Sequence, residues 1–122
     1  MPITYRIFAA EAFVLSTALG NLSDAELLGH QLELMGDSKF DPGYPQLDDL
    51  RGADMDNVTA ACIQTLARTQ VASKRCARRA LLVGSDVAYG LARMLQALRE
   101  GNQPEIRVFR DVDQALGWLG VS

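Results

Sequence analysis

The stretch from Arg79 to Leu98 restricts the fold of this 122-residue chain more than any other segment. Its apolar residues Ala80–Val83 follow one another without a polar break, as in a strand that is buried on both faces. The segment Gly84–Asp86 interrupts this run, and apolar residues then recur at helical spacing up to Leu98. A buried strand, a tight turn and a helix make half of a β-α-β unit, so the sequence predicts an α/β fold with parallel strands.

Other segments have the apolar or alternating pattern of strands, over residues 3–8, 13–19, 46–50 and 104–109. The first two are joined by a short connection, which favours an antiparallel hairpin. The predicted order is strand, strand, helix, strand, helix, strand, helix, strand, helix. We therefore expect one α/β domain over residues 1–122, with a single mixed, mostly parallel five-stranded sheet whose first strand lies at or near an edge.

The predicted helices begin at residues that cap helices well. Ser23 is followed three residues later by Glu26, which is the spacing of a capping box, and Gly36 ends this helix. The second helix runs to about residue 71, and the third covers residues 86–100. The predicted capping residues are Ser23, Asp56 or Asn57, Ser85 or Asp86, and Asp111.

Composition places the chain among globular proteins, since 48% of its residues are hydrophobic and 22% are charged. Its apolar runs are all shorter than the ~20 residues of a membrane span. The first residues, MPITYRIF, lack the pattern of a signal peptide, which makes the cytoplasm the expected compartment. Cys62 and Cys76 are then expected to be reduced.

The net charge of −3 conceals an asymmetry between the two halves of the chain. Acidic residues dominate up to residue 66, and basic residues dominate after it. The mildly acidic total argues against nucleic acid as a partner. The basic cluster Lys74–Arg79 is expected to be a solvated face; the alternatives are contact with an acidic patch on another protein, including another copy of this chain, or with anionic lipid headgroups.

The loop at 37–45 and the start of the third helix each allow two interpretations, a structural role or part of a ligand pocket. Phe40 and Tyr44 lie in the polar loop 37–45, where they either pin the loop to the core or form a lid or pocket wall. The turn at Ser85 and Asp86 either caps the third helix or holds an anion at its start. The candidate ligand-binding residues are Phe40, Tyr44, Ser85, Asp86, Tyr89, Arg93 and Met94.

Residues with the spacing of a catalytic, metal or cofactor site are missing from the sequence. His30 is the only histidine, has no Cys/His cluster around it, and is expected to be a surface or half-buried residue. Asp48 and Asp49 are neighbours on a predicted strand, so they point to opposite faces, and we expect the core-side one to pair with a basic group. Phosphate-binding glycine motifs are absent, so neither an enzyme nor a cofactor is expected.

Four segments together resemble the small bacterial SpoIIAA-like proteins, a family grouped with STAS domains and, more distantly, with the CRAL-TRIO lipid-transfer fold. The resemblance covers almost the whole chain and rests on the element order, on FDPGY followed by LDDLRG, on SDVAYGLARMLQAL and on RVFRDVDQALGWL. It implies an α/β sheet with helices packed largely on one side. Anti-anti-sigma factors of the STAS group carry a phosphorylated serine in a DSS-type motif, where this chain reads RGADMDNVT.

That departure leaves the phosphorylation switch unsupported, with Thr59 as the only hydroxyl near the corresponding position. The expected function is accordingly a non-enzymatic regulatory or protein-interaction module whose partner is an unknown protein or a second copy. The alternative is a binding protein for a small apolar or anionic molecule, or for a lipid, with an apolar pocket near the start of the helix at 86–100. Gly90 inside that helix costs about 1 kcal/mol relative to alanine, so we expect a neighbouring element to approach closely there.

Overall fold

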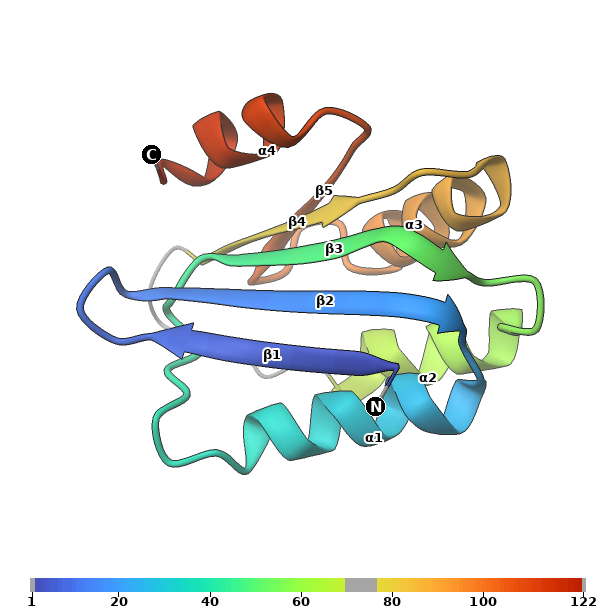
Figure 1. Ribbon diagram of the computed structural model, residues 1–122, viewed down its shortest axis with the longest axis horizontal. Coiled ribbons are helices and arrows are strands. Elements are labelled where there is room, and N and C mark those ends of the chain that lie inside the picture. Colours follow the sequence, from blue (N-terminus) through green and yellow to red (C-terminus); the bar gives the residue numbers. More distant parts are fainter. Residues whose placement is uncertain (1, 70–76, 122) are drawn as a thin grey trace.

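The chain alternates strands and helices in the predicted order. The structure, a computed structural model, describes residues 2–69 and 77–121. Its elements are β1 (Ile3–Phe8), β2 (Phe13–Asn21), α1 (Asp24–Met35), β3 (Gln46–Asp54), α2 (Ala60–Thr69), β4 (Arg78–Leu82), α3 (Asp86–Leu98), β5 (Glu105–Phe109) and α4 (Val112–Leu119) (Figure 1).

The described strands form one five-stranded sheet in the spatial order β1-β2-β3-β4-β5. β1 pairs with β2 antiparallel, with Ile3 opposite Ala18, whereas β2, β3, β4 and β5 pair in parallel. The predicted mixed, mostly parallel sheet with its first strand at an edge is confirmed.

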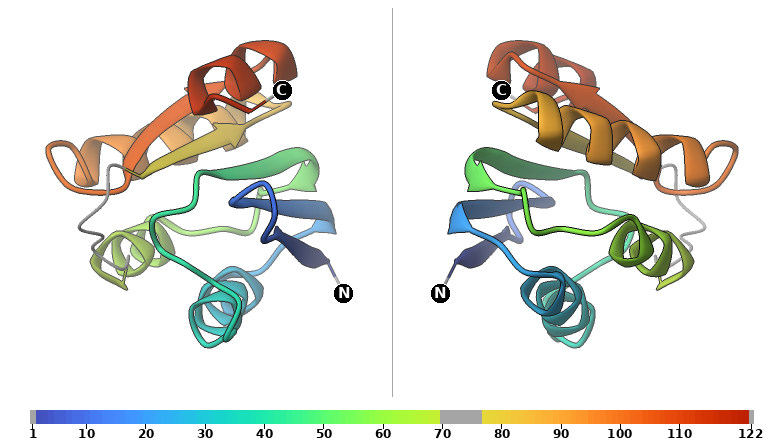
Figure 2. Two further views of the ribbon diagram at one scale, coloured as in Figure 1. Left: turned by 90° about the vertical axis from the view of Figure 1, so that its left-hand side faces the viewer. Right: turned by 90° about the vertical axis from the view of Figure 1, so that its right-hand side faces the viewer.

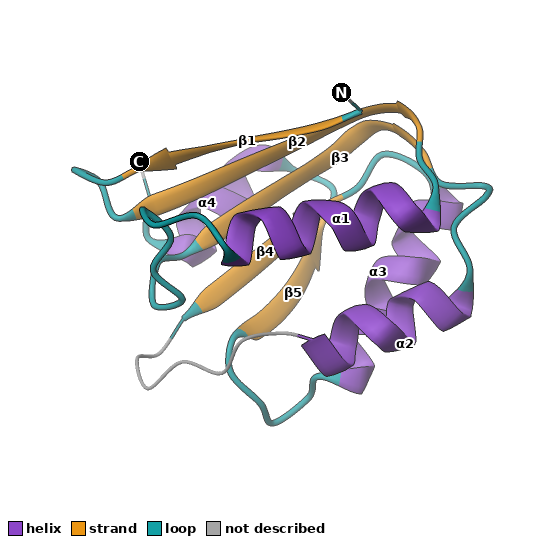
Figure 3. Cartoon of the chain, turned by 90° about the horizontal axis from the view of Figure 1, so that it is seen from below, coloured by secondary structure: helices purple, strands orange, loops and turns teal. Residues whose placement is uncertain are grey.

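Helices cover both faces of the sheet unequally. α1, α2 and α3 lie on one face and α4 lies on the other (Figures 2 and 3). β4 and the residue after it contribute to both cores, because Leu81 and Val83 pack towards α2 and α3 while Ala80 and Leu82 pack towards α4. Burial on both faces of the sheet therefore explains the unbroken apolar run from which the strand was predicted.

Several element boundaries differ from the sequence-based prediction. β2 and β3 continue to Asn21 and Asp54, because their parallel pairing resumes after an irregularity between Thr17 and Leu19. The second helix begins at Ala60 and not after Asp56 or Asn57, since the Oγ atom of Thr59 accepts the Cys62 backbone N–H at 3.1 Å and caps it. The predicted end of that helix near residue 71 lies outside the described residues.

Candidate functional site

The predicted ligand-binding residues lie at two opposite ends of the sheet. Phe40 and Tyr44 precede β3, at the amino ends of the parallel strands, whereas Ser85, Asp86 and the start of α3 follow the carboxyl end of β4. The structure therefore separates Phe40 and Tyr44 from the candidates at the start of α3 and along it. The predicted parallel strands already implied this separation, because the loop at 37–45 precedes one strand and the turn at 84–86 follows another.

The side chains at the start of α3 bind one another. Ser85 caps the helix, since its Oγ accepts the Ala88 backbone N–H at 3.1 Å. Asp86 forms an exposed ion pair with Arg110 at 2.9 Å, and the Arg110 guanidinium lies 4.7 Å from the centre of the Tyr89 ring. Capping and charge pairing thus account for the side-chain contacts of this turn.

The other two candidates near α3 have different surroundings. Arg93 donates a hydrogen bond to the Tyr89 hydroxyl at 3.3 Å, and it borders a polar groove of about 300 Å³ beside the end of α3. Met94 is half-buried and packs against the core between the sheet and α1–α3.

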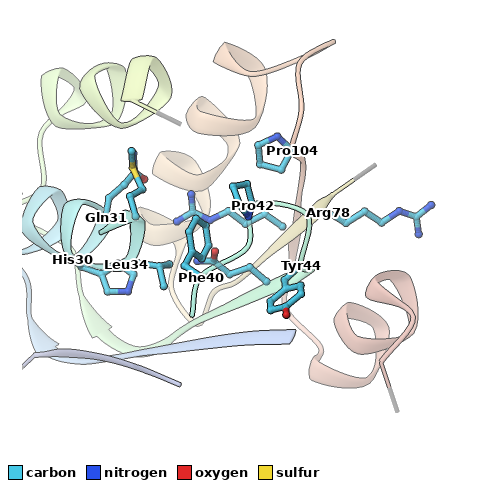
Figure 4. A pocket seen from close by; sticks show the side chains of 11 residues that line it. His30, Gln31, Leu34, Phe40, Pro42, Tyr44, Arg78 and Pro104 are labelled. Carbon is cyan, nitrogen blue, oxygen red and sulfur yellow. The ribbon is translucent and has the colours of Figure 1, made fainter. Parts of the chain in front are cut away.

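Phe40 and Tyr44 do line a hollow, which we call the loop cleft (Figure 4). It lies between the carboxyl half of α1, loop 37–45 and the amino ends of β3, β4 and β5, and its volume is about 40 Å³. Its lining residues are His30, Gln31, Leu34, Met35, Phe40, Pro42, Tyr44, Gln46, Arg78, Arg79 and Pro104. The size of the cleft restricts it to a small group.

A buried ion pair lies beneath the loop cleft. Arg79 donates from Nε to Oδ2 of Asp48 at 2.7 Å, and its Nη2 lies 2.6 Å from the same oxygen. The amide of Gln46 donates to the other oxygen, Oδ1, at 2.7 Å. Asp49 pairs instead with Arg51 at 2.9 Å. The prediction that the core-side aspartate pairs with a basic group is confirmed, and the structure shows that this aspartate is Asp48.

His30 borders the loop cleft as a half-buried residue, as predicted. Its Nε2 lies 3.0 Å from Oγ of Ser16, and its ring meets Tyr5 edge-on. Burial lowers the pKa of His30, and the nearby Asp48 carboxylate offsets this only in part. Within residues 2–69 and 77–121 there is no group of three or more histidine, cysteine or acidic side chains placed to hold a metal ion.

The basic cluster at 74–79 divides into unlike parts. Lys74, Arg75 and Cys76 lie outside the described residues. Arg78 is exposed and stacks on Trp118, whereas Arg79 is turned into the interior towards Asp48. Cys62 is a free thiol that lies buried, and burial raises its pKa to about 11.

Exposed apolar side chains on α1 and α3 are a feature that the sequence analysis missed. Leu32 is 64% exposed on α1, beside Met35, and Val87 and Leu98 are each 47% exposed on α3. In the sequence these residues have the same helical spacing as the inward-facing ones, because the apolar stripes of α1 and α3 are wider than the side of each helix that packs against the sheet. That excess width was the available signal.

The arrangement defines a class: a mixed α/β sheet with three helices on one face and one on the other, among the described residues. This is the SpoIIAA-like fold. A solved structure of an uncharacterised DUF3478-family protein with this fold, from Shewanella loihica PV-4, matches 96% of this chain and 93% of its own, with a TM-score of 0.58 and 18% identity. No protein-family model matches the chain, and no curated protein does.

The comparison confirms the fold that the resemblance implied, and at this identity it carries no information on activity. None of the described helices has the length and apolar character to cross a membrane.

Proposed function

We propose that the chain is a non-enzymatic interaction module that associates with further copies of itself, the outer face of α1 in one copy packing on the outer face of α3 in another. The observation that carries the proposal is that these two helices expose apolar side chains flanked by opposite charges. The free, buried thiol of Cys62 agrees with a cytoplasmic setting.

The α1 face is apolar and acidic. Leu32 and Met35 are exposed, and Glu33 lies beside them without a hydrogen-bonding partner among the described residues. Lysine and arginine are absent from Asp24–Met35. Such a face favours a surface that combines apolar and basic side chains.

The α3 face has that complementary character. Val87 and Leu98 are exposed on it, and Arg93 is exposed about a third of a turn around α3 from them. An arginine beside apolar side chains is a typical component of protein interfaces. Because both faces belong to the same chain, a second copy is the partner that the charges support.

Exposed glycines lie on both helical faces. Gly29 in α1 and Gly90 in α3 would each meet open space if a Cβ were added, so packing within the chain explains neither. For Gly90 this corrects the expectation of a neighbouring element close by. Glycine inside a helix costs about 1 kcal/mol relative to alanine, and close approach of a helix from another copy offsets that cost.

A charge exchange tests the proposal. Glu33→Arg and Arg93→Glu should each weaken self-association about tenfold, a change of about 1.4 kcal/mol, because each places like charges opposite one another. The double variant should restore association. Sedimentation velocity over a wide range of protein concentration measures all four proteins.

Leu32→Glu should also dissociate the copies, while Leu19→Glu is the control. Leu19 is equally exposed at 64%, but it lies on β2, away from both faces. A wild-type protein that stays monomeric at every concentration, or a double variant no better than the single ones, would overturn the proposal.

A further inference from the structure

We propose that the loop cleft binds a small monocarboxylate, whose two oxygens accept hydrogen bonds from the free edge of the Arg79 guanidinium. Met35 borders both this site and the α1 face, but the proposal does not depend on the self-association proposed above. It also differs from the pocket expected near the start of α3, because it lies at the amino ends of the strands.

Arg79 is held in place with donors to spare. A guanidinium has five N–H groups, and the hydrogen bonds of Arg79 to Asp48 use Nε and Nη2. Within the described residues, the N–H groups on Nη1 have no partner. Gln46 satisfies the second oxygen of Asp48, so the carboxylate is fully engaged in fixing the arginine.

Burying the charges of Arg79 and Asp48 costs desolvation free energy, so we expect the pair to have a role beyond packing. The side chains of Arg79 and Asp48 are only 12% and 6% exposed. A buried ion pair contributes little net stability, because desolvation of both charges offsets their attraction. A planar donor edge that is fixed in advance is what bidentate recognition of a carboxylate requires.

The walls of the cleft specify the rest of the ligand. Phe40, Pro42, Tyr44 and Pro104 supply flat apolar surface (Figure 4) to the same cleft that Arg79 lines. Arg79 also lines a second hollow of about 50 Å³ whose other walls are mostly apolar. Because the cleft has a volume of only about 40 Å³, the carboxylate enters it, and the flat apolar body of the ligand lies against the walls at its open side.

The charge balance excludes a more highly charged ligand. Asp48 already neutralises Arg79, and Arg78 points away from the cleft and donates to the backbone carbonyl of Trp118 (Figure 4). His30, whose pKa is lowered, adds no positive charge near neutral pH. A phosphate dianion would leave uncompensated charge next to Asp48, whereas a monocarboxylate gains the geometry of the guanidinium fork.

Benzoate is a suitable probe, and benzamide is its neutral match in shape. Titrations followed by NMR on isotope-labelled protein should show benzoate shifting signals around Phe40 and Tyr44, with at least about tenfold weaker binding of benzamide, as expected for loss of charge-assisted hydrogen bonds. Equal binding of the two probes, or binding of neither, would overturn the proposal.

Two variants separate the fork from general packing. Arg79→Lys keeps a cation for Asp48 but removes the planar fork, and should weaken benzoate binding about tenfold. Phe40→Ala removes a wall on a surface loop, leaves the ion pair intact, and should also weaken benzoate binding. This variant tests the proposal even where Arg79→Lys does not fold. Leu32→Glu should bind benzoate like the wild type, which keeps this test distinct from that of self-association.

Discussion

At the scale of single residues, two glycines on either side of one helix start have opposite roles. Gly84 lies against β3, where an added Cβ would meet the carbonyl oxygen of Arg51 at 2.9 Å and its Cα at 3.2 Å. Gly90, one turn into α3, faces open space. The first glycine is required for the chain to pass β3, and the second is not required by the isolated chain.

Alanine should therefore have opposite effects at the two positions. Gly84→Ala should destabilise the protein by about 1–3 kcal/mol, because the backbone of β3 cannot yield to the new methyl group. Gly90→Ala should stabilise it by about 1 kcal/mol through helix propensity. Urea unfolding of dilute protein measures both values.

The same Gly90→Ala variant also bears on self-association. A methyl group on the outer face of α3 should keep the α1 of a second copy at a greater distance, and so weaken association while the single chain becomes more stable. Equal or stronger association would show that Gly90 lies outside the interface.

Some residue-scale features could be read from the sequence and others could not. The Ser23–Glu26 capping box and the Asp111 cap are local patterns, and both are present as predicted. The pairing of Asp48 with Arg79 depends on the register of β3 against β4, which places Asp48 beside Leu81 and Gln46 beside Arg79. That register is a property of the assembled sheet, so the sequence predicted a basic partner but not which one.

At the scale of elements, Thr59 ties two helices together at their amino ends. Its hydroxyl donates to Oδ2 of Asp24 at 2.7 Å, and its backbone N–H donates to Oδ1 at 2.9 Å. The same hydroxyl oxygen caps α2. Because Asp24 is the first residue of α1, its contacts with Thr59 fix the starts of α1 and α2 relative to each other.

This tie predicts a dependence of stability on acid. The hydrogen bonds from Thr59 lower the pKa of Asp24 below its usual value. The ionised carboxylate therefore stabilises the folded state above the unfolded pKa of Asp24, and this contribution is lost as the pH falls through the lower, folded pKa.

Thr59→Ala should lower stability at neutral pH by about 1 kcal/mol through loss of the cap, and it should flatten the decline of stability in mild acid. Thermal melts of both proteins from neutral to acidic pH measure this. Thr65→Ala is a matched control, since the Thr65 hydroxyl bonds within α2 alone. An unchanged acid profile in Thr59→Ala would contradict the role of the Asp24 contact.

Element order and sheet topology were predictable because strong local periodicity fixed most strands and helices. The exposure of Leu32 and Val87 was not predictable, since both residues belong to apolar stripes whose spacing is that of core residues. The candidate site was predicted in part: Phe40 and Tyr44 do line a hollow. Its other walls, Arg79 among them, come from segments that only the folded sheet brings together.

At the scale of the whole molecule, opposite charges on α1 and α3 make association depend on ionic strength. Salt screens interactions between exposed charges, with a Debye length of about 10 Å at 0.1 M. Self-association should weaken as sodium chloride is raised at constant pH. Sedimentation velocity measures it, and an increase with salt would instead indicate a contact dominated by apolar surface.

The strands lie side by side in the sheet in the same order in which they follow one another along the chain, from β1 to β5. Each strand therefore finds its neighbour already in place when it emerges during synthesis, and no later strand has to be inserted between two earlier ones. Pairings between neighbours in sequence keep the loops that must close short, which favours rapid folding. The growing chain can thus shelter each apolar strand soon after it leaves the ribosome, with little exposure to aggregation.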